Sequence, residues 1–503
     1  MRSIENKDKK KKIIKVLGLV GLFVLVFGLS YALFRVTLTG KKKTRIKTAN
    51  FGLTLTDING NEESEGIAVN LENAVPESDE EGLSRDGYKF VVTNTGSIPA
   101  SYELKLNSTG TLSEEHIKYA LIEKDYLKKS DGNYYMGGIY DNAYRYNKWD
   151  EKDKDLEGPL KLSNLSNHNL DKTTLLPGEK MEYELKLWVE EDATVEEASG
   201  KYYETNIIVD GHQAEEYMSG KTGDTSKYTL YKDGTLAITG TGKIKTAVPN
   251  ESGFTVYNNA GPFGDIAVNY LNTIGYDIKN VNNEAVNMED ETTYHNMINV
   301  YLGIIYSNTN FLEYLTTAGD GNDFIESFVA FGIEDANAVR KLFSDLFNMP
   351  VHVTKVVMDE GIASIEDGAI VTGANADYMV TLPTTLENID TQAIGISTFE
   401  DYVGYGLIMP EILKTIPAES HIGNYLQYLN LSKIEKIETH GIYLHYMKEL
   451  NLPNTLKEVE SEGISVESDA IINIDNTREY VESHWDSNWL NDIGHNVTIN
   501  YLR

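Results

Sequence analysis

A stretch of chain between residues 119 and 155 combines aromatic residues with Asp, Asn and Gly. Sugar rings stack their C–H faces on aromatic side chains, and their hydroxyl groups need paired hydrogen-bond donors and acceptors. This composition predicts a glycan-binding loop. The aromatic residues that would contact a glycan are Tyr134, Tyr135, Tyr140, Tyr144, Tyr146 and Trp149. The alternative interpretation, which we favour, is an elaborated β-hairpin whose tyrosines cover the sandwich.

Oxygen ligands for a metal ion occur at two places, and neither has the spacing of an EF-hand loop. Asp150, Asp153, Asp155 and Glu157 lack that spacing and its Gly, and residues 320–323 (DGND) imitate only part of such a loop. The chain has no Cys, which excludes thiolate zinc sites, iron–sulfur clusters and disulfides. We therefore expect no metal and no cofactor, and we interpret the acidic segments as solvated charge.

Motifs for catalysis are missing from the sequence. It contains no His-Glu-x-x-His, no Gly-x-Ser-x-Gly and no Gly-rich dinucleotide loop. Residues 240–243 (GTGK) end like a phosphate-binding loop, but Ala237 stands in place of its first Gly and Ile244 in place of its Ser or Thr. His440 and His445 do not share a helix face, so we interpret them as surface or packing residues. We predict that the protein is not an enzyme.

The charge is divided between a basic head and an acidic body. The chain of 503 residues has a formal net charge of -32, but residues 1–47 contain 13 Lys and Arg against 2 Asp and Glu. The remaining 456 residues contain 32 basic and 75 acidic residues, a net charge of -43. Such a field repels phosphate backbones, so we expect no binding to nucleic acid.

Residues 1–45 are predicted to form a basic head and a membrane segment. The run Val16–Phe34 has 19 residues without a charge. As a helix it would span about 28 Å, close to the thickness of the hydrocarbon core. Small residues at Ser30 and Ala32 also permit cleavage of a secretory signal after Ala32. The segment therefore predicts either a transmembrane helix with the body outside the cell or secretion after cleavage.

Residues 46–212 have the pattern of a β-sandwich. Five segments mix alternating polarity with β-branched and aromatic residues. They are residues 51–55, 88–92, 102–106, 183–189 and 203–209. The turns at 93–99 (TNTGSIP) and 176–179 (LPGE) resemble turns of secreted bacterial sandwich domains of the TasA and camelysin kind.

Residues 213–350 begin with a predicted hairpin and continue as a helical insertion. The segment 228–242 (YTLYKDGTLAITGTG) has an Asp-Gly turn between two strand-like runs. It resembles the segment that introduces the repeats of BspA-like leucine-rich-repeat surface proteins. From residue 265 to residue 349, apolar residues recur at three- and four-residue spacings, which is typical of helices.

Residues 351–503 repeat a short unit. Five triplets place apolar residues at i and i+2, namely 356–358, 380–382, 407–409, 429–431 and 450–452. An apolar anchor follows each triplet: Ile365, Ile389, Ile416, Ile437 and Val459. The anchors are 24, 27, 21 and 22 residues apart. This period predicts a solenoid in which neighbouring coils bury their apolar sides against each other.

The repeats also resemble those of BspA-like proteins. Leu382-Pro383, Met409-Pro410 and Leu452-Pro453 match the family's strand and Pro turn, although Ile or His421 stands where the family has Phe. A helix at 477–489 and a strand at 496–501 resemble its closing cap. The predicted fold is therefore multidomain and mainly β, with an N-terminal transmembrane helix, a β-sandwich, a helical insertion and a C-terminal leucine-rich-repeat solenoid with a cap.

The resemblance to BspA-like proteins implies a bacterial cell-surface protein that recognises an extracellular protein or glycan through its repeats. In this interpretation the N-terminal helix holds the chain in the membrane, and the C-terminus lies outside the cell. The sandwich resemblance suggests a structural subunit of an extracellular matrix or fibre instead. A secreted carbohydrate-active enzyme that uses the tyrosine-rich loop is a third alternative.

Overall fold

The computed structural model describes most of the chain from residue 35 onward. The described ranges are 35–39, 52–58, 68–72, 75–129, 131–142, 159–244, 261–279, 335–365, 379–390 and 405–503, with short gaps in the last, and six residues between 302 and 329. Val16–Phe34, residues 144–157, residues 320–323, His421 and His445 lie outside them. Within the described part, no helix has both the length and the apolar character needed to cross a bilayer.

The N-terminal part of the fold contains two antiparallel sheets. The first has the order β1-β11-β5-β9, with β3 also paired to β11. Its strands are β1 (Arg35–Thr39), β3 (Ala68–Glu72), β5 (Ala100–Gly110), β9 (Asn169–Leu175) and β11 (Tyr202–Gln213). The second sheet begins with the order β2-β4-β10-β6-β7, and β8 pairs with β6. Its strands are β2 (Leu53–Asp57), β4 (Tyr88–Asn94), β6 (Ile117–Lys128), β7 (Tyr134–Asp141), β8 (Leu160–Lys161) and β10 (Lys180–Val189).

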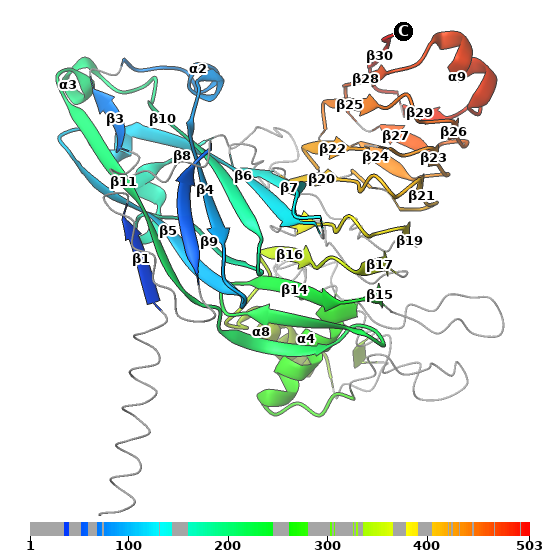
Figure 1. Ribbon diagram of the computed structural model, residues 1–503, viewed down its shortest axis with the longest axis horizontal. Coiled ribbons are helices and arrows are strands. Elements are labelled where there is room, and N and C mark those ends of the chain that lie inside the picture. The colour runs from blue at the N-terminus through cyan, green and yellow to red at the C-terminus, as the bar shows by residue number, and fades with distance from the viewer. Residues whose placement is uncertain are drawn as a thin grey trace, which may run out of the picture.

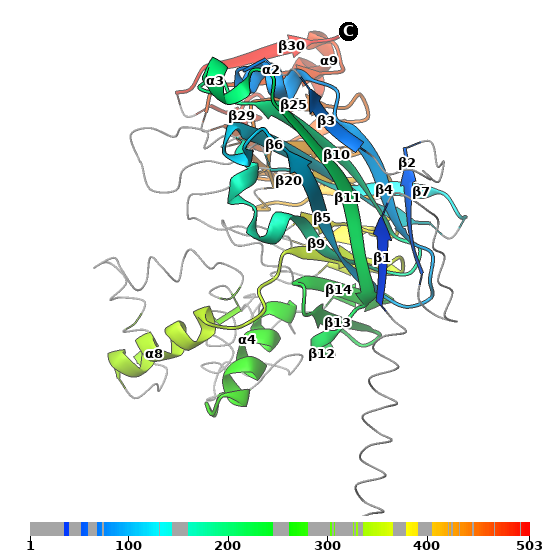
Figure 2. The same cartoon turned by 90° about the vertical axis from the view of Figure 1, so that its left-hand side faces the viewer.

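The two sheets face each other as a sandwich (Figure 2). Buried and partly exposed residues alternate along β10, as expected for a strand with one face in a core. The core includes Tyr102 of the first sheet and Phe90 and Tyr183 of the second, and the last two rings stack with centroids 5.0 Å apart. The short helices α2 (Asp79–Ser84) and α3 (Val195–Ala198) and the 3₁₀ turns η1 (Glu114–His116), η2 (Leu162–Asn164) and η3 (Ser166–His168) connect the strands.

The C-terminal part is a β-solenoid of about five turns. One series of strands begins with the hairpin β12 (Glu216–Lys221) and β13 (Ser226–Tyr231) and continues upward in Figure 1 from β14. Its members are β14 (Thr235–Gly240), β16 (Lys355–Met358), β18 (Met379–Thr381), β20 (Tyr405–Ile408), β22 (Tyr428–Asn430), β25 (Glu449–Leu452), β28 (Ala470–Ile474) and β30 (Val497–Tyr501). All five predicted triplets fall on this series, from β16 to β25, within one residue of the strand ends.

Shorter strands form the other sides of the coils. They are β15 (Gly242–Ile244), β17 (Ile362–Ile365), β19 (Asn388–Ile389), β21 (Thr415–Ile416), β23 (Lys436–Ile437), β26 (Glu458–Val459), β24 (Ile442–Leu444), β27 (Ile464–Val466) and β29 (Leu490–Asn491). The five predicted anchors end β17, β19, β21, β23 and β26, and all five are buried in one core. The predictions of a mainly β protein and of a C-terminal solenoid are confirmed.

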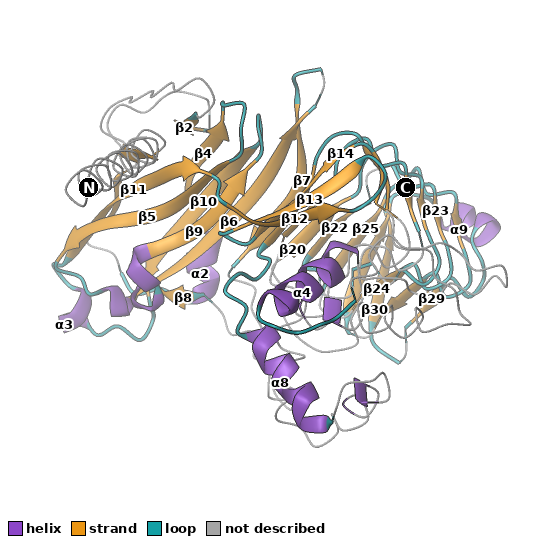
Figure 3. Cartoon of the chain, turned by 90° about the horizontal axis from the view of Figure 1, so that it is seen from below, coloured by secondary structure: helices purple, strands orange, loops and turns teal. Residues whose placement is uncertain are grey.

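The solenoid begins before residue 351. Strand β14 pairs in parallel with β16, with Leu236 opposite Val356, although the two residues are far apart in the chain. The helices α4 (Gly261–Thr273) and α8 (Ala336–Phe347) belong to the segment between these strands and lie below the first coil in Figure 1; Figure 3 shows the same helices from below. Phe343 of α8 packs edge-on against Phe328, with centroids 5.0 Å apart. The helical segment is therefore inserted between the first two rungs.

The last coil is closed by a helix and a strand, as predicted. Helix α9 (Arg478–His484) is shorter than the predicted 477–489, and Thr477 caps its start by accepting a hydrogen bond from the Tyr480 N–H. Trp485 and Trp489 follow the helix and meet edge to face over the end of the core, with centroids 5.2 Å apart. The cap therefore covers apolar residues that the final coil would otherwise expose.

Candidate functional site

Strand β7 joins the sandwich to the solenoid. It pairs with β6 on one side and antiparallel with β20 on the other, where Ile139 lies opposite Gly406 and Gly138 opposite Leu407. The second sheet of the sandwich therefore continues through β7 into β20 and β22. A Cβ atom on Gly137 would lie 2.6 Å from Cγ2 of Thr381, so the close approach of β7 to the solenoid requires glycine. The two parts share one sheet.

Three of the six aromatic residues predicted to bind a glycan lie on β7. Tyr135 donates a hydrogen bond from Oη to the Ile408 carbonyl at 3.1 Å, and Tyr140 packs against the sandwich core. Tyr134 is exposed, and the Lys180 ammonium lies 4.4 Å from its ring centroid. These contacts favour the hairpin interpretation for Tyr135 and Tyr140. Tyr144, Tyr146 and Trp149 lie outside the described residues, and the glycan-binding loop stays a prediction.

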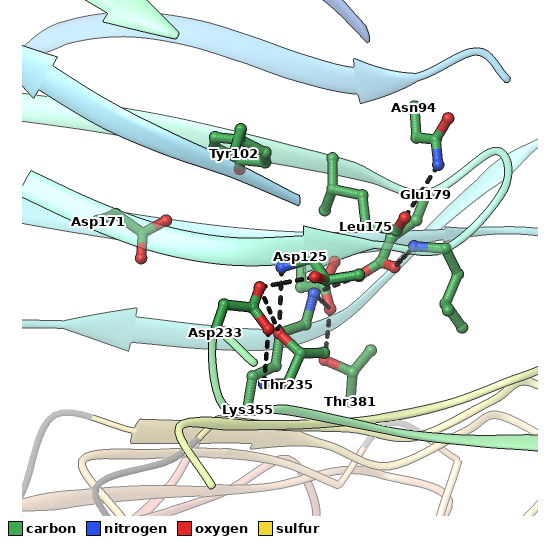
Figure 4. A network of polar contacts seen from close by, with 12 residues as sticks. Asn94, Tyr102, Asp125, Asp171, Leu175, Glu179, Asp233, Thr235, Lys355 and Thr381 are labelled. Carbon is green, nitrogen blue, oxygen red and sulfur yellow. Dashed lines mark hydrogen bonds and ion pairs between the residues drawn. The ribbon is translucent and has the colours of Figure 1, made fainter. Parts of the chain in front are cut away.

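A buried cluster of polar groups lies where the sandwich meets the first coils (Figure 4). We define the junction cluster as Asp125 of β6, Glu179 of the turn before β10, Lys355 of β16 and Thr381 of β18. The Lys355 ammonium forms ion pairs with Glu179 and, at 3.0 Å, with Oδ2 of Asp125. Thr381 donates a hydrogen bond to the same oxygen at 2.7 Å. The exposed fractions of the Lys355, Asp125 and Glu179 side chains are 3%, 0% and 1%.

The turn between β9 and β10 positions Glu179. Gly178 has φ of 83°, a value that favours glycine, and Oε2 of Glu179 accepts a hydrogen bond from the Leu176 N–H at 2.5 Å. The Asn94 side chain donates to the Leu175 carbonyl at 2.9 Å, and its backbone N–H donates to the Glu179 carbonyl at 3.0 Å. Hydrogen bonds thus join the turn at residues 93–99 to the turn at residues 176–179, and together the two turns hold Glu179 at the junction.

The Asp-Gly turn of the β13–β14 hairpin contacts the sandwich beside this cluster. Thr174 of β9 donates a hydrogen bond from Oγ1 to Asp233 at 2.6 Å, and its N–H donates to Oγ1 of Thr235 at 3.0 Å. The Thr235 N–H donates to Asp233 at 3.1 Å, which fixes the turn. Hydrogen bonds therefore connect the sandwich to the first rung of the solenoid, and ion pairs connect it to the second.

Burial changes the protonation of the junction. It raises the pKa of Glu179 well above its usual range, and the Asp125 carboxylate raises it further, while Lys355 opposes both. Burial likewise raises the pKa of Glu123, and the Asp171 charge adds to this effect. For Lys355, burial lowers the pKa, but the attraction of Asp125 and Glu179 outweighs it and the net shift is upward. One cation thus faces several carboxyl groups, of which Glu179 and Glu123 tend to keep their protons.

A second candidate site lies on the exposed face of the last solenoid strands. Asn451, Asn473 and Asn500 occupy paired positions of β25, β28 and β30. Asn473 donates a hydrogen bond to Asn451 at 3.0 Å, and Asn500 donates to Asn473 at 2.9 Å. We refer to these three residues as the Asn ladder. Asn473 also donates to Glu449 at 2.8 Å, and the exposed side chains of Ile471 and Thr498 flank the ladder.

His440 lies on another side of the coils, between two glutamates. Its Nδ1 is 2.8 Å from Glu419 and its Nε2 is 3.0 Å from Glu462. The three residues have φ of 53°, 54° and 52°, so they occupy the same left-handed position of successive turns. Hydrogen bonds to Glu419 and Glu462 raise the pKa of His440. The described residues contain no group of His, Asp and Glu side chains arranged to hold a metal ion.

Sequence reasoning missed the junction cluster, because its members are separated by long stretches of chain. Lys355 is 176 residues from Glu179, and Thr381 is 256 residues from Asp125. The one local signal was Lys355 itself, a charged residue at the start of a strand whose four residues are all buried. Comparisons with known proteins add no assignment: no family model, no curated protein and no solved structure matches the chain.

Proposed function

We propose that this protein is a bacterial cell-surface recognition protein whose solenoid binds an extracellular protein or glycan. The observation that carries the proposal is the exposed Asn ladder, which repeats the same polar side chain on successive coils of one strand face. Side-chain amides both donate and accept hydrogen bonds and carry no charge. They suit partners that present hydroxyl or peptide groups. The resemblance of the repeats to BspA-like leucine-rich repeats supports the same conclusion.

The arrangement of the fold favours presentation of this face away from a membrane. Strand β1 begins at Arg35, which directly follows the apolar run Val16–Phe34. Arg35 pairs with His212, near the point where the chain passes to β12 and the first coil. The coils then stack away from this end, toward the cap (Figure 1). If the run is a membrane anchor, the first coil lies nearest the membrane and the Asn ladder lies far from it.

A binding assay with the full chain tests the proposal. The purified protein is applied to panels of extracellular matrix proteins and glycans, and each ligand it binds is tested again with a variant in which Asn451 and Asn473 are replaced by Ala. We expect the double variant to lose binding at least about tenfold, the effect of about 1.4 kcal/mol. The matched control replaces Lys436 and Glu460, a partly exposed pair on another side of the coils, by Ala.

Three results would overturn the proposal. If the double Asn substitution left binding unchanged, the strand face that carries the Asn ladder would not take part in the interaction. Spontaneous polymerisation of the full chain without a ligand would favour a matrix or fibre subunit. Hydrolysis of a polysaccharide would favour a carbohydrate-active enzyme.

A further inference from the structure

The junction cluster holds an amine and a carboxylate in direct contact. Nζ of Lys355 is 3.0 Å from Oδ2 of Asp125, and both side chains are almost fully excluded from water. This oxygen is bonded to Cγ, the carbon that the amine would attack, and reactive groups held in such contact behave as if at very high concentration. We propose that Lys355 and Asp125 condense to an intramolecular isopeptide bond. This bond links β16 of the solenoid covalently to β6 of the sandwich.

The condensation needs no other reactant. A proton passes from the Lys355 ammonium to the Asp125 carboxylate, and the free amine attacks Cγ of Asp125. A C–N bond forms, a C–O bond breaks, and one water molecule leaves. An ammonium and a carboxylate thus become a neutral amide and water, and both atoms and charge balance. No oxidant, reductant or activating group is consumed.

Glu179 is placed to relay the protons. It contacts Nζ of Lys355, and the Leu176 N–H at 2.5 Å fixes its other oxygen. Burial raises the pKa of Glu179 well above its usual range, which favours the protonated carboxyl group that a proton relay needs. The proton of this group can protonate the departing oxygen of Asp125, and Glu179 then recovers one from the nitrogen. Its contact with the attacking nitrogen places Glu179 within the hydrogen-bond reach that general acid–base catalysis requires.

The surroundings favour the uncharged product. An apolar cluster built from both parts of the fold lies beside the site: Leu127, Leu176, Tyr231, Ala237 and Val357. Oδ1 of Asp125 is buried and accepts no hydrogen bond from the described residues. An ion pair in such a place bears a desolvation cost, and an amide removes both charges and that cost with them. The buried position therefore shifts the balance from the free ions toward the bond.

Peptide mapping by mass spectrometry tests the proposal directly. The full-length protein is denatured, digested and searched for a branched peptide that contains both Asp125 and Lys355. We expect this peptide to be lighter than its two components by one water molecule. We expect K355R and E179Q to lose it and to release two linear peptides. K436R is the matched control, because Lys436 pairs with Glu460 at 2.6 Å where solvent has access, and it should keep the Asp125–Lys355 bond.

Two results would contradict the proposal. Linear peptides containing unmodified Asp125 and Lys355 from folded wild-type protein would exclude the bond. A branch between Lys355 and Glu179 would show that Glu179, rather than Asp125, is the acceptor. Circular dichroism establishes that the variants fold, and the wild-type map decides the question even if a variant does not.

Discussion

Lys355 and Lys436 each begin a short solenoid strand, and each contacts more than one carboxylate, but their surroundings are opposite. Lys355 is 3% exposed and is enclosed between the sandwich and the solenoid. Lys436 is 30% exposed and lies 2.6 Å from Glu460 and 3.3 Å from Glu438 on the outside of the coils. The ion pairs of Lys355 therefore connect the sandwich to the solenoid, whereas those of Lys436 lie on the outer surface of the coils.

Solvent access decides how much a charged pair contributes to the stability of the fold. Exposed pairs gain little, because water screens their attraction. Breaking a buried pair is costly, because the remaining charge has neither a partner nor water. Substitutions that are matched between the two sites should consequently differ in effect.

The largest difference is expected for loss of the cation. Replacing Lys355 by Met removes both the cation and the proposed bond and leaves the carboxyl groups of Asp125 and Glu179 buried without a partner, so we expect a loss of at least about 3–5 kcal/mol in the free energy of unfolding. Replacing Lys436 by Met should cost less than about 1 kcal/mol. Urea denaturation measures both. Equal losses in the free energy of unfolding would contradict this expectation, because they would mean that water reaches the junction as readily as it reaches the surface.

The junction should also respond to pH. Glu179 and Glu123 have pKa values raised by burial, so the folded protein keeps protons that the unfolded chain releases. Their stabilising contribution is complete below the ordinary pKa of about 4.5 and is lost as the pH rises through the raised values. We expect the free energy of unfolding to fall with a slope on the order of 1 kcal/mol per pH unit per carboxyl within that range. Urea denaturation from about pH 5 to about pH 9 measures this slope, and E179Q should reduce it.

We expect a smaller difference in stability when one threonine hydrogen bond is removed near Lys355 and another near Lys436. Thr381 donates to buried Asp125 at 2.7 Å, whereas Thr439 donates to partly exposed Glu460 at 3.4 Å. T381V should cost about 1–3 kcal/mol, because it leaves a buried oxygen of Asp125 without its hydrogen-bond donor. T439V should cost less than about 0.5 kcal/mol. Thermal unfolding of the two variants compares them, and a larger loss in T439V would reverse the account.

The smallest effect is expected at His440. Its pKa is raised by hydrogen bonds to Glu419 and Glu462, so its contribution is present below the ordinary value of 6.5 and is lost as the pH rises through the raised value. The side chain is partly exposed, and screening limits this contribution to less than about 1 kcal/mol. Denaturation of H440Q across this pH range should show a flatter profile than wild type. An unchanged profile would mean that the glutamates leave His440 unperturbed in solution.

The repeats could be predicted from the sequence because their signal is local. Ile365, Ile389, Ile416, Ile437 and Val459 recur at nearly regular intervals, and each is the buried last residue of a strand. The first rung, β14, was missed because the helical insertion separates it from β16. The pairing of β7 with β20 was missed for a similar reason, since nothing near Gly138 indicates a partner at Leu407.

The candidate sites divide in the same way. Asn451 is the middle residue of the predicted triplet 450–452, and Asn473 and Asn500 also lie between two apolar residues, so the Asn ladder follows from a local pattern in the sequence. The junction cluster could not, because Asp125, Glu179 and Lys355 come from segments that meet only in the folded chain. Tertiary packing brings charged residues of different elements together in one site. Their spacing in the sequence does not indicate this contact.

Differential scanning calorimetry of the full chain tests most directly whether the sandwich and the solenoid form one structural unit. The shared sheet and the junction cluster predict a single unfolding transition whose calorimetric and van't Hoff enthalpies agree. Two separate transitions in the wild-type protein would contradict the account, because they would show that the sandwich and the solenoid unfold independently.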